Sequence, residues 1–201
     1  MLAFARDLPN VCSLAGLLAA LLGLYFAIRG VYPAAMMALL WAVVFDWSDG
    51  RIARGMKGRT ADQRAFGAQL DSLIDIVSFS VAPALLLLSV GRFSPWFIPG
   101  AFVILATGVT RLSHFSAFGL LDDSTYRGLA LDNNVLVLAL LFVGEPVVGA
   151  TIFATVIYVA LMVLAALNVA PIETPKLGGR WYYAVILYAL VLSGVYGWQL
   201  T

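Results

Sequence analysis

Apolar segments long enough to cross a lipid bilayer recur along nearly the whole chain of 201 residues. About 20 residues of α-helix cross the hydrocarbon region, and a helix satisfies its own backbone hydrogen bonds there. The segments together predict an all-α integral membrane protein, with one domain over residues 1–201 built as a bundle of six to seven transmembrane helices. They cover residues 10–28, 31–52, 69–90, 96–117, 128–144, 147–167 and 180–199, of which 128–144 is short.

The composition supports this fold class. Hydrophobic residues make up 62% of the chain and charged residues 11%, whereas soluble domains carry about 25% charged residues. The single cysteine, Cys12, lies in an apolar run, so neither a disulfide framework nor a zinc cluster is expected. No cleavable signal peptide is expected either, because Arg6 and Asp7 precede the first segment without a small-residue cleavage pattern. No nucleic-acid partner is expected.

The basic residues are distributed unevenly between the two sides of the predicted bundle. With the N-terminus in the cytoplasm, only Arg29 and Arg92 of the 12 basic residues lie on the outer side. This bias follows the positive-inside rule. It predicts a protein of the cytoplasmic membrane whose loop between the second and third segments faces the cytoplasm. The cytoplasmic set consists of Arg6, Arg51, Arg54, Lys57, Arg59, Arg64, Arg111, Arg127, Lys176 and Arg180.

Four aspartates form two helical pairs inside this apolar chain. Asp46 and Asp49 are three residues apart and Asp71 and Asp75 are four apart, so each pair projects from a single face of its helix. Ionisable groups at membrane depth are costly and seldom lack a partner or a function. Four carboxylates facing one another repel unless cations lie between them, and hard oxygen ligands suit Mg²⁺ or Mn²⁺. The pattern predicts a metal site, with interfacial helix caps as the alternative.

Other polar residues are expected at the same depth as the aspartates. With a rise of about 1.5 Å per residue, Asp46, Asp75 and Arg111 all lie roughly 20–23 Å from the outer surface. Ser13 and Asn134 fall in or near this layer. Five helices are therefore expected to line a polar cavity in the cytoplasmic half of the membrane, open to the cytoplasm.

The residues around the aspartates resemble the signature of the CDP-alcohol phosphotransferases, membrane enzymes that make phospholipid headgroup linkages. The chain reads Asp-x-x-Asp-Gly-x-x-Ala-Arg and then Gly-x-x-x-Asp-x-x-x-Asp. Residues 66–84 look most like the phosphatidylserine synthase branch, whereas the loop 55–66 is about one helical turn longer than is usual in the family. The signature residues, which run from 46 to 75, are Asp46, Asp49, Gly50, Ala53, Arg54, Gly67, Asp71 and Asp75.

The resemblance implies a reaction and a metal cofactor. A phosphatidyl group passes from a CDP-linked lipid, such as CDP-diacylglycerol, to the hydroxyl of a small alcohol, and CMP is released. Two divalent ions, Mg²⁺ or Mn²⁺, clamp the diphosphate of the donor. Asp46, Asp49 and Asp71 are implied to be metal ligands, and Asp75 is implied to be the catalytic base that also touches a metal.

The resemblance also assigns residues to the donor. Asp49 and Arg54 are implied to bind it, and the small residues Gly50, Ala53 and Gly67 are implied to let the nucleotide approach the helices closely. Small residues equally suit helix–helix packing in membranes, which is the alternative for these three. The family also leaves a homodimer open, and membrane lipids surround the bundle.

The acceptor is less defined than the donor. Residues 71–84 favour L-serine, but the chain departs from the serine branch in residues 111–116 and 128–134. Choline, inositol or another polyol therefore stays open, as does the choice between a diacylglycerol and an ether lipid. A divalent-cation transporter is the alternative of a different class, although the outer halves of the second, third and fourth segments are almost wholly apolar.

Three residues are candidates for binding the acceptor or a phosphate, namely Arg111, His114 and Asp132. The planar guanidinium of Arg111 suits an anion. His114, the single histidine, has an interface role as its alternative, and Asp132 has the role of a cap for the fifth helix.

Overall fold

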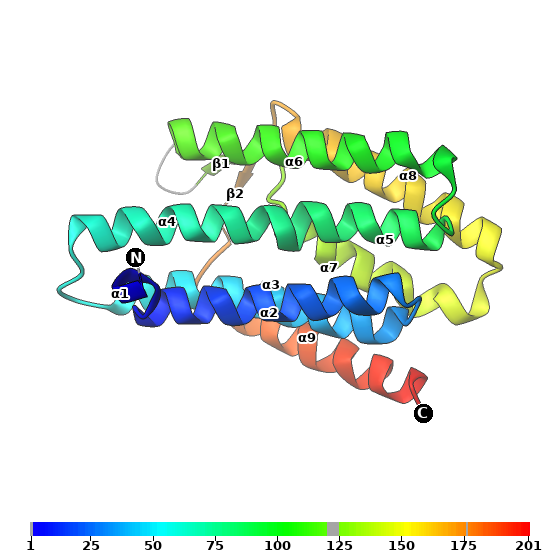
Figure 1. Cartoon of the computed structure of the whole chain (residues 1–201), viewed down its shortest axis with the longest axis horizontal. Helices are drawn as coiled ribbons and strands as arrows, with labels where there is room; N and C mark the ends of the chain where they lie inside the picture. Colours follow the sequence, from blue (N-terminus) through cyan, green and yellow to red (C-terminus); the bar gives the residue numbers. More distant parts are fainter. Residues whose placement is uncertain (1, 120–124, 176) are drawn as a thin grey trace.

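The structure is a computed structural model that describes residues 2–119, 125–175 and 177–201, so Lys176 lies outside the described residues. Its long helices run roughly along one axis as a bundle (Figure 1). The elements are α1 (Leu2–Ala5), α2 (Leu8–Ile28), α3 (Tyr32–Gly55), α4 (Ala61–Ile76), η1 (Val77–Val81), α5 (Ala82–Val90), η2 (Pro95–Phe97), α6 (Ile98–Phe118), β1 (Thr125–Arg127), α7 (Asp132–Leu141), η3 (Phe142–Val147), α8 (Ala150–Val169), β2 (Glu173–Pro175) and α9 (Arg180–Gln199).

The helical prediction for the seven apolar segments is confirmed, and the chain is an α-helical membrane protein. Among the described residues, five helices are long and apolar enough to cross a membrane. α3 is 24 residues long but carries Asp46, Ser48 and Asp49 in its second half, and it is not one of the five. α7, in the short fifth segment, has 10 residues and continues only as the 3₁₀ turn η3. The five spans are Leu8–Ile28, Ala61–Val90, Pro95–Phe118, Ala150–Val169 and Arg180–Gln199.

The third segment begins at Ala61, earlier than the predicted residue 69, because a capping box starts the helix there. The backbone N–H of Gln63 donates to Oγ1 of Thr60 at 3.1 Å, and the Thr60 N–H donates to Oε1 of Gln63 at 2.8 Å. This exchange satisfies two of the N–H groups that the first helical turn leaves unpaired. The aspartates of this helix therefore lie well inside it rather than at its end.

The same helix contains a π-helical turn, η1, directly after the second aspartate pair. Pro83 lies four residues after Phe79 and has no N–H to donate to the Phe79 carbonyl. The side-chain amide of Asn134, on α7, donates to that carbonyl instead at 3.1 Å. The side-chain amide of Asn168, on α8, is in turn hydrogen-bonded to that of Asn134. A buried amide network thus supports the irregular turn beside the aspartates.

A small two-stranded sheet is present that the sequence analysis did not predict. β1 and β2 pair antiparallel, with Tyr126 opposite Thr174. The hydroxyl of Thr174 donates to the carbonyl of Gly128 at 2.6 Å, which extends the connection past the end of β1. Gly128 has a φ of +75°, and a Cβ there would collide with the backbone carbonyl of Asn168. The pairing ties the segment before α7 to the segment before α9.

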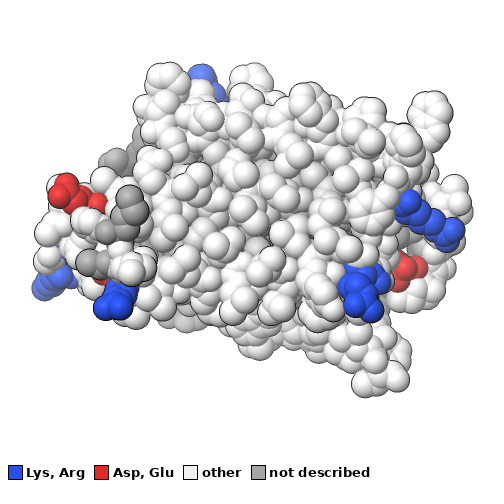
Figure 2. Space-filling model, viewed as in Figure 1, with Lys and Arg blue, Asp and Glu red and all other residues white. Residues whose placement is uncertain are grey.

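The helices α2 and α3 pack closely against each other. A Cβ added to Gly16 would meet Cβ of Phe45 at 3.2 Å, and one added to Gly23 would meet Cγ of Leu39 at 2.7 Å. Glycines of this kind let two membrane helices approach closely. Figure 2 shows that charged side chains on one face gather toward the two ends of the molecule, apart from one basic group at the upper edge, and that the middle is uncharged.

Candidate active site

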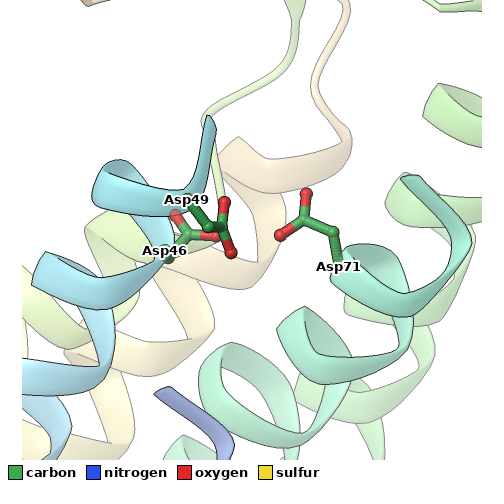
Figure 3. Close-up of side chains that lie close together, drawn as sticks. All are labelled: Asp46, Asp49 and Asp71. Carbon is green, nitrogen blue, oxygen red and sulfur yellow. The ribbon is translucent and has the colours of Figure 1, made fainter. Parts of the chain in front are cut away.

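Three carboxylates from two helices meet at one point. Asp46 and Asp49 project from α3, and Asp71 faces them from α4 (Figure 3). One oxygen from each of the three residues lies within 4.8 Å of the others. An all-carboxylate set of this kind matches the oxygen ligands that Mg²⁺ and Mn²⁺ prefer. The residues that the structure describes therefore fit a hard divalent ion at this point.

A serine on a third helix supports this group. The hydroxyl of Ser13, on α2, donates to Oδ2 of Asp49, and it also lies 3.1 Å from the carbonyl of Pro9. Both Ser13 and Asp49 are buried. A hydrogen bond from a neutral hydroxyl fixes the direction of the carboxylate without neutralising its charge, so Asp49 stays available to a cation.

Asp75 lies one helical turn beyond Asp71 and lines the same cavity, but it is not a member of the three-carboxylate group. Its Oδ1 is buried and has no hydrogen-bond partner within the part of the chain that the structure describes. A buried polar atom that lacks a partner is costly and requires an explanation. Asp75 is thus a buried carboxyl group beside the cavity that the described residues leave partly unsatisfied.

The carboxylates line a cavity of about 430 Å³. Its walls come from α3, α4, η1 and α6, from Tyr126 on β1, from residues 129–133, and from the segment that runs from β2 into α9. The volume falls within the range of about 300–1,000 Å³ that is usual for small-molecule sites. Segments far apart in the sequence therefore converge on the aspartates.

The structure brings some of the predicted donor and acceptor residues to this cavity. Gly50 and Arg54 line it beside the aspartates of α3, and a Cβ added to Gly50 would lie 3.3 Å from Nη1 of Arg54. Arg111 and Asp132 also line it. These four residues share the cavity with the three-carboxylate group.

Other predicted residues do not line the cavity. Ala53 is absent from its walls, and Gly67 directs its open side to Asn10 and Arg59, where a Cβ would lie 2.9 Å from Oδ1 of Asn10 and from Nη2 of Arg59. The ring of His114 packs 4.9 Å from that of Phe118 and does not reach the cavity. Gly67 therefore has an observed packing role.

Asn134, which was expected in or near the layer of the aspartates, does not line the cavity. It is buried and committed to the network with Phe79 and Asn168. Its amide supports the helix that carries Asp71 and Asp75, so its contribution to the site is indirect.

Trp47 and Tyr182 are among the aromatic residues on the cavity wall that the sequence analysis missed. Nε1 of Trp47 donates to Oδ2 of Asp132 at 2.8 Å, and the hydroxyl of Tyr182 lies 3.0 Å from that of Ser48. The guanidinium of Arg51 lies 5.0 Å from the centre of the Tyr182 ring. Trp47 and Arg51 occupy positions that the signature leaves variable, so the motif gave no signal for them.

Tyr126, on β1, covers the guanidinium of Arg111, which lies 5.7 Å from the centre of its ring. Burial, followed by the negative charge of Asp132, raises the pKa of Tyr126 above its usual value. The phenol therefore stays protonated and neutral at ordinary pH. It contributes an aromatic face toward Arg111 rather than a second charge.

The fold and the site together define a class of protein: a polytopic membrane protein with an acidic centre that could hold a metal ion. The chain belongs to the CDP-alcohol phosphatidyltransferase family, whose model matches residues 6–193. The resemblance read from the signature is therefore confirmed.

Curated relatives agree with this family. An archaetidylserine synthase of Methanothermobacter thermautotrophicus is 36% identical over 111 residues, which are 54% of this chain and 46% of the relative. A CDP-diacylglycerol–serine O-phosphatidyltransferase of Mycobacterium bovis is 34% identical over 141 residues, 69% of this chain and 44% of the relative. One from Methanocaldococcus jannaschii is 29% identical over 153 residues, 76% of this chain and 69% of the relative. The match spans less than half the length of the first two relatives.

Proposed function

We propose that this chain, acting as one domain over residues 1–201, transfers a phosphatidyl group from a CDP-linked lipid to the hydroxyl of a small alcohol and releases CMP. The observation that carries the proposal is the convergence of Asp46, Asp49 and Asp71 at the wall of a cavity large enough for a ligand. Family membership supplies the reaction class. It also argues against a divalent-cation transporter.

Two Mg²⁺ or Mn²⁺ ions, when bound, neutralise the diphosphate of the donor and stabilise the negative charge that develops on the leaving phosphate. Asp46, Asp49 and Asp71 hold the ions, and Asp75 contributes from the next helical turn. The charge of the carboxylates alone would repel a diphosphate, so donor binding depends on the cations.

The chemical step requires a base near the acceptor hydroxyl. We assign this role to Asp75, because it lines the same cavity and its buried Oδ1 has no hydrogen-bond partner among the described residues. The hydroxyl oxygen attacks the phosphorus of the phosphatidyl group, and its proton passes to Asp75. The bond from that phosphorus to the bridging oxygen breaks, and its electron pair leaves with CMP.

The donor occupies the part of the cavity formed by α3. Asp49, Gly50 and Arg54 lie there together, so the nucleotide approaches the helix at Gly50 and a phosphate pairs with Arg54. Ala53 and Gly67 act from outside the cavity wall by permitting the helices to pack. The lipid portion of the donor remains in the membrane.

The active site is proposed to face the cytoplasm of the cell membrane. Arg29 and Arg92 follow α2 and α5 at the end of the bundle opposite the loop between α3 and α4 (Figure 1). The other ten basic residues were assigned to the cytoplasmic side in the sequence analysis, which is the bias that the positive-inside rule describes. The cavity then opens toward water-soluble acceptors and CMP.

L-serine is the acceptor that we favour, because the relatives named above are described as serine or archaetidylserine enzymes. Choline, inositol or another polyol is the alternative, and either diacylglycerol or an ether lipid can complete the donor. His114 is left without an acceptor role, since it packs on Phe118 outside the cavity. A homodimer is compatible with the proposal but not required by it.

The test is CMP release by the purified full chain in lipid vesicles with Mg²⁺, CDP-diacylglycerol and a panel of alcohols. L-serine is expected to give phosphatidylserine and one CMP for each lipid formed. Asp71→Asn, which preserves size, is expected to remove most of the release, whereas Asp62→Asn, in the first turn of α4, is expected to leave it unchanged. CMP release that persists in Asp71→Asn at the wild-type rate contradicts the assignment.

A further inference from the structure

We propose that Arg111 and Asp132 form an acceptor subsite for a zwitterionic amino alcohol, with Arg111 taking its carboxylate, Asp132 taking its ammonium group, and Trp47 positioning Asp132. The inference rests on the proposed transferase function and specifies which class of alcohol the cavity accepts. Three observations carry it, one for each residue.

Arg111 is a buried cation that forms no ion pair with any of the residues that the structure describes. It lies on α6 with 8% of its surface exposed, and its Nε has no hydrogen-bond partner among the described residues. The ring of Tyr126 covers the guanidinium, whose Cζ lies 5.7 Å from the centre of the ring. A buried charge is costly unless it is paired. Because Arg111 lines the cavity, a ligand that carries negative charge can pair with it there.

Asp132 is held in one orientation by neutral donors on both of its oxygens. Trp47 donates to Oδ2 at 2.8 Å, and the backbone N–H of Asn133 donates to Oδ1 at 3.0 Å. Neither donor neutralises the carboxylate, and no cation in the described part of the chain forms an ion pair with it. Asp132 is therefore fixed on the cavity wall and free to receive a positive group.

Trp47 links this subsite to the metal-binding helix. It stands between Asp46 and Asp49 on α3, and its indole N–H reaches across to α7. This hydrogen bond fixes the position of the Asp132 carboxylate relative to the helix that carries two of the proposed metal ligands. Trp47 is a positioning residue, because it acts through Asp132 and not on the acceptor.

The two charges are close enough to act on each other, yet they form no ion pair within the described residues. A lone arginine would suit a phosphate, but the nearby carboxylate of Asp132 would repel one. An amino acid with a hydroxyl satisfies both residues at once, because its carboxylate and ammonium group share one carbon. Its hydroxyl lies one carbon away and can reach toward Asp75, which lines the same cavity. Choline, inositol and glycerol leave Arg111 unpaired.

Two analogues of serine separate the contributions of the charges. Ethanolamine is serine without its carboxylate, and 3-hydroxypropionate is serine without its ammonium group. The measurement is kcat and KM for each alcohol with the full chain, Mg²⁺ and saturating CDP-diacylglycerol in vesicles. The wild-type protein is expected to prefer serine over each analogue by about 10- to 100-fold in kcat/KM, the range typical of one charge-assisted contact.

The variants are expected to lose only the matching preference. Arg111→Gln raises the KM for serine and removes its advantage over ethanolamine, while ethanolamine itself is used as before. Asp132→Asn removes the advantage over 3-hydroxypropionate. Trp47→Phe keeps the ring but removes the donor, so it weakens the same preference as Asp132→Asn to a smaller extent. Arg127→Gln, an exposed arginine on β1, is the control and changes neither preference.

The possible results separate a failure of the acceptor subsite from a failure of the proposed transferase function. A purely structural role for either residue lowers the rates of all three alcohols together and contradicts the subsite. An increase in the KM for CDP-diacylglycerol in Arg111→Gln, with serine discrimination intact, assigns the arginine to a phosphate and also contradicts it. A wild-type protein that uses serine no better than the analogues overturns the subsite but leaves the transferase assignment intact. No CMP release with any alcohol overturns both.

Discussion

The side-chain amide of Asn134 takes the place of the backbone donor that Pro83 lacks. It lies 3.1 Å from the carbonyl oxygen of Phe79, inside the π-helical turn that follows Asp75. Single π-helical turns occur frequently at functional sites, where they change the direction of neighbouring side chains. A residue on α7 therefore supports the helix that carries two of the four aspartates.

Replacing Asn134 by alanine is expected to destabilise the protein. The Phe79 carbonyl and Asn168 would each lose a buried hydrogen-bond partner, so the cost should be about 1–3 kcal/mol. Thermal unfolding in detergent measures the loss. Thr155→Ala is the matched control, since it removes an exposed side-chain bond to the carbonyl of Thr151 within one helix. An Asn134→Ala protein as stable as this control contradicts the supporting role.

Removing divalent cations is expected to abolish CMP release, and adding Mg²⁺ or Mn²⁺ is expected to restore it. The reason is that the diphosphate cannot lie among Asp46, Asp49 and Asp71 unless cations neutralise it. The measurement is CMP release in chelator followed by metal titration. Asp46→Asn and Asp49→Asn should each require more metal for half-maximal activity or lose activity altogether. Full turnover in excess chelator excludes the metal-dependent mechanism.

Asp75→Asn is expected to separate chemistry from binding. Asparagine keeps the size of the side chain and one oxygen but cannot take the proton from the acceptor. Loss of a general base typically lowers the rate by about 10²–10⁴-fold, so kcat should fall in this range while the affinity for CDP-diacylglycerol changes little. The readouts are single-turnover rates and donor binding. If donor binding is lost together with the rate, Asp75 is a metal ligand rather than the base.

Leucine substitutions at Gly50 and Gly67 are expected to fail in different ways. Gly50 lines the cavity, so Gly50→Leu should weaken CDP binding while the fold survives. A Cβ added to Gly67 would lie 2.9 Å from side-chain atoms of Asn10 and Arg59. Gly67→Leu should therefore lower the unfolding temperature first. Cytidine affinity and thermal unfolding, measured on both variants, test the distinction. Equal losses of stability in both would show that Gly50 also serves packing.

The helices and the aspartate group could be read from the sequence because both depend on local spacing. Segment length identifies membrane helices, and separations of three or four residues place Asp46 with Asp49 and Asp71 with Asp75. The early start at Ala61 was also readable, because Thr60 and Gln63 have the spacing of a capping box. That signal was overlooked because the apolar pattern begins later.

Contacts between distant segments could not be predicted in the same way. β1 and β2 have three residues each and pair only because α7 and α8 bring them together. The bond from Trp47 to Asp132 likewise depends on how α3 and α7 pack. Gly67 was interpreted through its motif, and only the structure shows what its open side touches. Long-range geometry decides each of these, and a single sequence does not encode it locally.

The pairing of β1 with β2 has a consequence for how this protein family can diversify. Main-chain hydrogen bonds hold the segments before α7 and α9, and such bonds do not depend on which side chains the strands carry. Residues 129–133, which line the cavity beside this pairing, can therefore change identity while the frame around them keeps its shape. A different acceptor can therefore be accommodated by exchanging a few side chains on the cavity wall while the strand pairing stays intact.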